Sequence, residues 1–264
     1  MFYKTYSMNY DKKNNYGLNH DNLVFLVGFP RSGTTLIDSI LRSHSNTTVL
    51  EEKPYLINIR HKFFSENKLE YIEYITEDEI KKLQNIYFNS FDYNEKKIII
   101  DKFPLNLIEI GFIKKIFPKS KIVLVLRHPL DTILSCVLTS FKINEAMANY
   151  ENLNTSAFFY NEVFSLFDVY KNSLKLNYHE IKYENIVYDF NNEINSLLKY
   201  LNLEYEETIK NFYITAKDRE KINTPSYHQV IKPIYNKSVY RYKKFDDTKT
   251  IQPIVNRWIN EFKY

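Results

Sequence analysis

Short apolar runs alternate with amphipathic stretches along the first half of the chain. The runs are Leu23–Val27, Lys97–Asp101 and Lys121–Leu126. The amphipathic stretches that follow them are Thr34–Arg42, Leu105–Phe117 and Leu130–Leu138. Apolar runs of this length suit strands that are buried on both faces of a parallel sheet. Repeated strand-then-helix units predict an α/β fold of three layers, with a central, mostly parallel sheet flanked by helices.

The second half of the chain continues this pattern more weakly. His179–Tyr183 is a further strand candidate. Helical patterns cover Thr155–Leu176, Ile186–Leu201 and Thr250–Phe262. No repeat, low-complexity tract or Pro/Gly-rich linker divides the chain. We therefore expect a polar N-terminal arm over residues 1–22 and a single domain over residues 23–264.

Composition narrows the function classes. The 264 residues are enough for one sizeable core, and a net charge of +4 is too small to indicate a nucleic-acid partner. A single cysteine, Cys136, excludes an intrachain disulfide, and the six histidines show no close pair at metal-ligand spacing, so we expect no metal. No apolar run approaches the length of a membrane span or a signal peptide, which favours the cytoplasm.

The stretch Gly28–Thr35 reads GFPRSGTT and lies between a predicted strand and a predicted helix. Backbone N–H groups and the helix dipole bind anions in this context, which makes Ser32, Gly33, Thr34 and Thr35 candidates for phosphate binding. The spacing matches a P-loop, but the expected Lys after the second glycine is absent and Arg31 lies inside the loop. This weakens the case for ATP or GTP hydrolysis. An ordinary strand-to-helix turn is the alternative.

Residues 30–36, PRSGTTL, are very similar to the 5′-phosphosulfate loop of sulfotransferases that use 3′-phosphoadenylyl sulfate (PAPS). The branch most resembled contains the tyrosylprotein sulfotransferases and their bacterial relatives. The resemblance implies a P-loop-type fold and a second anion site for the 3′-phosphate of the donor.

A second anion site is predicted at Arg127 and Ser135. Arg127 ends a predicted strand, where open α/β sheets place their ligands, and Ser135 lies on the helix that follows. The family's 3′-phosphate motif is similar, with an Arg and a Ser eight positions apart. The alternative is that Arg127 pairs with Asp131 and that Ser135 bonds to its own helix.

Carboxylates follow the phosphate loop at Glu51 and Glu52. A carboxylate near this loop could accept the proton of an attacking hydroxyl. In the tyrosylprotein branch the second Glu of a pair at this spacing is the base, which implies that role for Glu52; solvated acids paired with Lys53 are the alternative. His44 is a rival base, because soluble small-molecule sulfotransferases use His, but it is expected to end the first helix.

Further site residues come from the strand ends. Lys102 closes a predicted strand and could offset charge on the leaving oxygen, a function that the family's Lys has at this point. Residues 183–187, YENIV, resemble a family segment whose Tyr lies near the donor nucleotide, which implicates Tyr183. Residues 225–234 resemble the segment that covers the donor, and a basic residue nine positions after its Lys, here Arg241, implies a further contact at the 3′-phosphate side.

Together these residues predict sulfuryl transfer from PAPS to an acceptor hydroxyl or amine by in-line displacement, without a metal. Glu52 would be the general base, Arg31 and Lys102 would offset leaving-oxygen charge, and 3′,5′-adenosine diphosphate (PAP) would be the product. The acceptor could be a carbohydrate, peptide, lipid or small metabolite. The alternatives are a kinase-like protein or nucleotide hydrolase on the same loop, and a nucleotide-binding protein without transfer.

Overall fold

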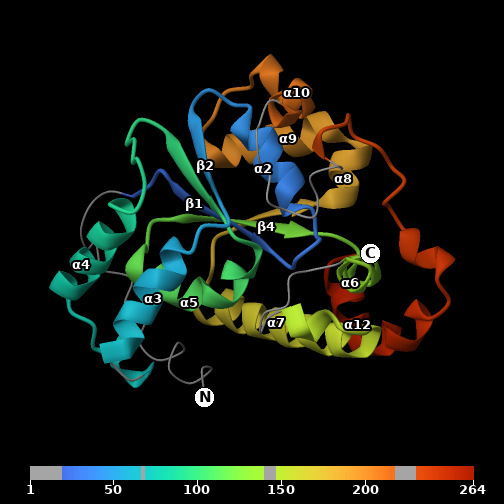
Figure 1. Ribbon diagram of the computed structural model, residues 1–264, viewed down its shortest axis with the longest axis horizontal. Helices are drawn as coiled ribbons and strands as arrows, with labels where there is room; N and C mark the ends of the chain where they lie inside the picture. The colour runs from blue at the N-terminus through green and yellow to red at the C-terminus, as the bar shows by residue number, and fades with distance from the viewer. Residues whose placement is uncertain (1–19, 67–68, 140–146, 218–229) are drawn as a thin grey trace.

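A parallel sheet forms the centre of the protein in the computed structural model, which describes residues 20–66, 69–139, 147–217 and 230–264 (Figure 1). Within these residues it has five strands in the order β2-β3-β1-β4-β5. The strands are β1 (Leu23–Gly28), β2 (Thr47–Glu51), β3 (Ile98–Lys102), β4 (Lys121–Leu126) and β5 (His179–Lys182). The chain crosses to β3 and β2 on one side of β1 and to β4 and β5 on the other. Ligands of open α/β sheets bind outside the carboxyl ends of the strands at such a reversal.

Helices cover both faces of the sheet (Figure 1). One face carries α2 (Thr34–Arg42), α8 (Tyr183–Tyr188), α9 (Phe190–Leu201) and α10 (Phe212–Lys217). The other carries α3 (Tyr55–Glu66), α4 (Glu77–Phe88), α5 (Ile110–Ile116), α6 (Pro129–Val137), α7 (Leu153–Ser173) and α12 (Thr248–Glu261). This confirms the predicted three-layer α/β architecture.

The central strand β1 shows why two faces are needed. All six of its residues are buried. Leu23, Phe25 and Val27 pack into the core under α7 and α12, while Val24 and Leu26 pack against α2 and α9. A continuous apolar run can only be buried in this way when helices lie on both sides of the sheet.

Most predicted elements match the structure, with differences at the edges. The predicted helix Ile186–Leu201 is two helices, α8 and α9, which are separated at Asp189 (φ −143°). The strand β2 and the helices α3 and α4 were not predicted. β2 is an edge strand of five residues, and its first two residues, Thr47 and Thr48, interrupt any apolar run. Within the described part of the chain, no helix combines the length and apolarity needed to cross a bilayer.

The predicted N-terminal arm falls mostly on residues 1–19, which lie outside the described residues. Its last three residues belong to the fold. His20 is 3% exposed and its ring stacks on Phe88 at 4.1 Å, and burial lowers the pKa of His20 to about 4. The Asn22 amide donates to the carbonyl of Lys97 at 2.9 Å. Packing therefore begins before the first strand.

Candidate active site

The loop between β1 and α2 lies at the reversal point of the sheet, and two glycines permit its shape. A Cβ on Gly28 would lie 2.6 Å from the carbonyl oxygen of Val125 and 2.7 Å from Ser32 Oγ. Gly33 has φ +111°, and a Cβ there would lie 3.0 Å from the Tyr183 ring. α2 then begins without a side-chain cap. This is the arrangement that leaves backbone donors of a first helical turn available to an anion.

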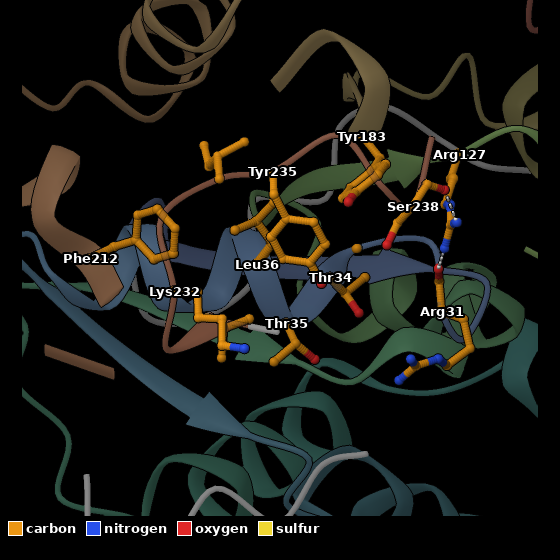
Figure 2. Close-up of a pocket in the computed structure, with 13 residues that line it drawn as sticks. Arg31, Thr34, Thr35, Leu36, Arg127, Tyr183, Phe212, Lys232, Tyr235 and Ser238 are labelled. Carbon is orange, nitrogen blue, oxygen red and sulfur yellow. Dashed lines mark hydrogen bonds between the residues drawn. The ribbon is translucent and has the colours of Figure 1, made fainter. Parts of the chain in front are cut away.

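A cavity of about 610 Å³, including its open mouth, lies beside this loop. Figure 2 shows Arg127, Ser238 and Arg31 toward one end, Phe212 and Lys232 toward the other, and Leu36 and Tyr235 between them. The residues that line it are Arg31, Gly33, Thr34, Thr35, Leu36, Arg127, Tyr183, Phe212, Val230, Lys232, Ile234, Tyr235 and Ser238. Six of these were predicted to bind the donor: Arg31, Gly33, Thr34, Thr35, Arg127 and Tyr183. Its lining combines cationic and hydroxyl side chains with apolar and aromatic ones, a mixture that is typical of ligand sites.

Two buried donor groups indicate that the ligand is polar. Ser32 Oγ and Arg127 Nε are buried and have no hydrogen-bond partner among the described residues. Buried polar groups are rarely left unsatisfied, because each costs about 1–3 kcal/mol. Arg127 is 8% exposed and lines the cavity. An anion at this end of the cavity would satisfy the guanidinium.

Arg127 is held from three sides. Its Nη2 donates to the carbonyl of Ser238 at 2.6 Å and lies 3.8 Å from Asp131 Oδ2. Its Nη1 donates to the carbonyl of Arg31 at 3.3 Å (Figure 2). The guanidinium lies 5.1 Å from the centre of the Tyr183 ring. Arg127 therefore pairs with Asp131 and also lines the cavity. A structural ion pair and an anion-binding role for Arg127 are thus compatible.

Ser135 and Arg31 join the loop to α6. Arg31 Nε donates to Ser135 Oγ at 3.1 Å, and Arg31 has φ +71°. Burial lowers the pKa of the Arg31 guanidinium, although its usual value is so high that it stays charged. Ser135 does not line the cavity directly and is one contact away from it, through Arg31.

A cluster of charges lies at the ends of β2 and β3, on the other side of the loop. Lys102 is fully buried, and its Nζ donates to Glu52 Oε1 at 2.6 Å. Among the described residues, two further carboxylates lie near this ammonium: Glu51 Oε1 at 3.7 Å and Asp38 Oδ2 at 3.8 Å. The Glu52 side chain is 38% exposed, so it can reach a ligand in solvent. The buried Lys102 Nζ thus lies within 4 Å of three carboxylates.

His44 lies at the opposite edge of the sheet. α2 runs from the phosphate loop toward the amino ends of the strands, and His44 follows it directly. The backbone N–H of Asn46 donates to His44 Nδ1 at 3.0 Å, so Nε2 carries the proton and donates to the carbonyl of Glu204 at 2.8 Å. These contacts join two loops far from Lys102, so the position of His44 leaves Glu52 as the candidate base.

The remaining predicted residues are placed differently. Tyr183 lines the cavity. Arg241 is exposed, lies over the ring of Phe245 at 5.6 Å, and is not among the lining residues. Residues 225–229 of the predicted covering segment lie outside the described residues, whereas Val230, Lys232 and Ile234 line the cavity.

Sequence reasoning did not single out Phe212, Tyr235 and Ser238, which also line the cavity. Phe212 begins a short helix 177 positions after Thr35, and no local motif marks it. Asp38 was missed as well, because its proximity to Lys102 arises from the packing of α2 on β3. Among the described residues, no group of three or more potential ligand side chains is arranged to hold a metal.

The fold defines an α/β protein of the P-loop type, with a cavity beside the loop that follows β1. The sequence model of the sulfotransferase family matches residues 23–207. The chain belongs to this family. The match confirms the predicted family, whereas the use of PAPS and the tyrosylprotein branch stay predictions.

One relative matches most of this chain. An uncharacterized protein of Aquifex aeolicus (strain VF5) is 25% identical over 252 residues, which are 91% of this chain and 32% of that protein. The chain thus spans about a third of the length of that relative.

Solved structures share the fold. The sulfotransferase domain of the Synechococcus PCC 7002 olefin synthase has a TM-score of 0.64 at 17% identity, covering 97% of this chain and 98% of that one. The sulfotransferase domain from the curacin biosynthetic pathway has a TM-score of 0.57 at 15% identity, with 88% and 96% covered. Mouse sulfotransferase SULT7A1, complexed with PAP, has a TM-score of 0.57 at 14% identity, with 90% and 84% covered. At these identities the likeness concerns the fold.

Proposed function

We propose that this protein transfers the sulfuryl group of PAPS to an acceptor hydroxyl or amine, with Glu52 as the general base. The order of groups along the carboxyl edge of the sheet carries the proposal. Glu52 and Lys102 lie at the ends of β2 and β3, the glycine loop follows β1, and Arg127 and Tyr183 follow β4 and β5. A proton acceptor, a phosphate loop and a second anion site thus follow one another along one edge.

The residues present fit the donor. The loop around Gly33 and the first turn of α2, which begins without a side-chain cap, would hold the 5′-phosphosulfate. Arg127 would bind the 3′-phosphate with its buried Nε, and Ser135 would support it through Arg31. The rings of Phe212 and Tyr235, which line the cavity, suit stacking with a nucleobase. Arg241 remains a candidate for the outer side of the 3′-phosphate.

The chemistry needs a base and positive charge at the leaving oxygen. The donor supplies the sulfuryl group and departs as PAP. Glu52 would take the proton of the acceptor, for which its partly exposed carboxylate is suitable. Lys102 and Arg31 would offset the charge on the leaving oxygen. The two remaining carboxylates beside Lys102 keep its ammonium balanced when Glu52 turns toward the acceptor.

We propose only the chemical class of the acceptor, a molecule with a hydroxyl or an amine. A carbohydrate, peptide, lipid or small-metabolite hydroxyl would each satisfy the chemistry, because fold and donor site do not determine the acceptor pocket. A cytoplasmic location stays a prediction.

Thermal stabilisation by PAP in EDTA tests the donor site. A ligand that binds the native state raises the melting temperature, and about 2.7 kcal/mol at a hundredfold excess over Kd corresponds to roughly 5–10 °C for a chain of this size. We expect such a shift for the wild type, its near loss in Arg127→Ala and a smaller shift in Ser135→Ala.

The matched control is Arg257→Ala, which removes a half-exposed arginine of α12 that pairs with Asp168 on α7. Its PAP-dependent shift should equal that of the wild type. A shift with ATP and Mg²⁺ but none with PAP would contradict the proposal and favour a kinase-like protein. PAP binding without release of PAP from PAPS across an acceptor panel would favour a binding protein.

A further inference from the structure

A buried carboxylate lies behind the anionic end of the donor cavity. Glu184 is 4% exposed and directly follows Tyr183. Its Oε1 accepts a hydrogen bond from the backbone N–H of His128 at 2.9 Å, and its Oε2 accepts one from the hydroxyl of Tyr264 at 3.0 Å. Because His128 directly follows Arg127, this one carboxylate connects the two segments that carry Arg127 and Tyr183.

Glu184 makes this connection just beyond the last paired residues of β4 and β5. The pairing of β4 with β5 ends at Leu126 and Lys182, one residue before Arg127 and Tyr183. The distance of 5.1 Å between the Arg127 guanidinium and the Tyr183 ring therefore depends on contacts other than ladder hydrogen bonds. Glu184 supplies such a contact.

Tyr264 holds the carboxylate from the other side. Burial raises the pKa of the Tyr264 hydroxyl, so it remains a proton donor. Its ring lies 5.2 Å from the His128 ring and 5.3 Å from Lys182 Nζ, and Lys182 Nζ also donates to the carbonyl of Phe262 at 2.6 Å. The end of the chain is thereby fixed beside α6 (Figure 1).

We propose that Glu184 and Tyr264 are positioning residues for the end of the donor site that recognises the 3′-phosphate. Neither lines the cavity, so both act through Arg127 and Tyr183. This inference rests on the proposed function. It predicts that removing the Tyr264 hydroxyl weakens recognition of the 3′-phosphate and leaves the rest of the nucleotide site intact.

Binding of two nucleotides tests this selectively. Calorimetric titration in EDTA gives the Kd of PAP and of 5′-AMP, which lacks the 3′-phosphate. In Tyr264→Phe we expect the preference for PAP over 5′-AMP to fall about fivefold to tenfold, the effect of one ordinary hydrogen bond, with the Kd of 5′-AMP changed less than twofold. Tyr188→Phe is the control, since it makes the same change at an exposed position of α8.

A second pair of variants separates geometry from folding. Glu184→Gln keeps an oxygen acceptor for the His128 N–H, so it should retain more of the preference than Glu184→Ala. Circular dichroism without ligand establishes whether each variant is folded. If Glu184→Ala does not fold, Tyr264→Phe alone tests the positioning role.

Each outcome has one meaning. An unchanged preference in Tyr264→Phe, or an equal loss of affinity for both nucleotides, would overturn the positioning role. A wild type that does not prefer PAP over 5′-AMP would instead overturn the proposed donor.

Discussion

At the scale of single residues, backbone strain coincides with the proposed chemistry. Arg31 has φ +71° and Glu52 has φ +47°, and neither is glycine. A left-handed backbone costs an ordinary residue about 1 kcal/mol, so it persists only where other contacts hold it. The N–H of Glu52 donates to the carbonyl of Lys102 at 2.8 Å, which fixes the turn that directs the Glu52 carboxylate to Lys102 Nζ.

This strain predicts an unusual order of stability at position 52. Glu52→Ala and Glu52→Gly both lose the contact with Lys102, but glycine adopts positive φ without strain. We therefore expect the free energy of unfolding of Glu52→Gly, measured by urea denaturation, to exceed that of Glu52→Ala by about 1 kcal/mol. Both variants should lose sulfuryl transfer. If Glu52→Ala is the more stable variant, the backbone at this position is not strained.

At the scale of elements, two helices begin in opposite ways. α4 starts with a capping box, in which Thr76 Oγ1 accepts from the N–H of Glu79 and Glu79 Oε2 accepts from the N–H of Thr76 at 2.8 Å. α2 starts after Gly33 with no side-chain cap. A cap made by the protein stabilises a helix, whereas a helix start without one leaves its donors for a ligand.

The two helix starts predict opposite effects of substitution. Thr76→Ala should cost about 1 kcal/mol of stability and leave the PAP-dependent melting shift unchanged. Gly33→Ala should abolish that shift. The alanine would have to adopt φ +111°, and its Cβ would lie 3.0 Å from the Tyr183 ring. Chemical denaturation and thermal shift measure the two effects separately. Loss of PAP binding in Thr76→Ala, or its retention in Gly33→Ala, would contradict this division.

At the scale of the whole molecule, the central sheet separates two buried titratable side chains. Lys102 and Asp101 are adjacent on β3 and fully buried, and alternation along the strand directs them to opposite faces. Lys102 faces Asp38 on α2. Asp101 Oδ2 accepts from the Tyr87 hydroxyl at 2.6 Å on the side of α4, and burial raises the pKa of Asp101 to about 7.

Asp101 should make global stability depend on pH. Its pKa is about 7 in the folded protein, against an ordinary value of 3.8, so its carboxyl is protonated on folding. Its contribution is fully present below pH 4 and is lost as pH rises to 7, by up to about 4 kcal/mol. The free energy of unfolding of the wild type, minus that of Asp101→Asn, should fall over this range. The subtraction cancels the opposite effect of His20 and His128, whose pKa values are lowered to about 4.

The parts of the site that could be predicted are those whose residues lie close together in the sequence, in short motifs. The loop around Gly33 and the segment from Arg127 to Ser135 each place their residues within ten positions, next to a strand whose apolar run is unmistakable. Lys102 also ends a predicted strand, whereas Glu52 was proposed from its spacing after the phosphate loop in the resembled family, because β2 was not predicted. Phe212, Tyr235 and Ser238 could not be found, because they reach the cavity from segments whose path over the sheet has no local signature.

The amino-acid sequence by itself determined the layered α/β class, the phosphate loop and the family. Each of these depends on hydrophobic periodicity and on residue spacing over short stretches, and both can be identified without knowledge of the fold. Tertiary structure alone decided that Lys102 meets three carboxylates, that His44 lies at the wrong edge, and that Glu184 joins Arg127 to Tyr183. These contacts depend on strand order, which brings together residues that are 50 or more positions apart.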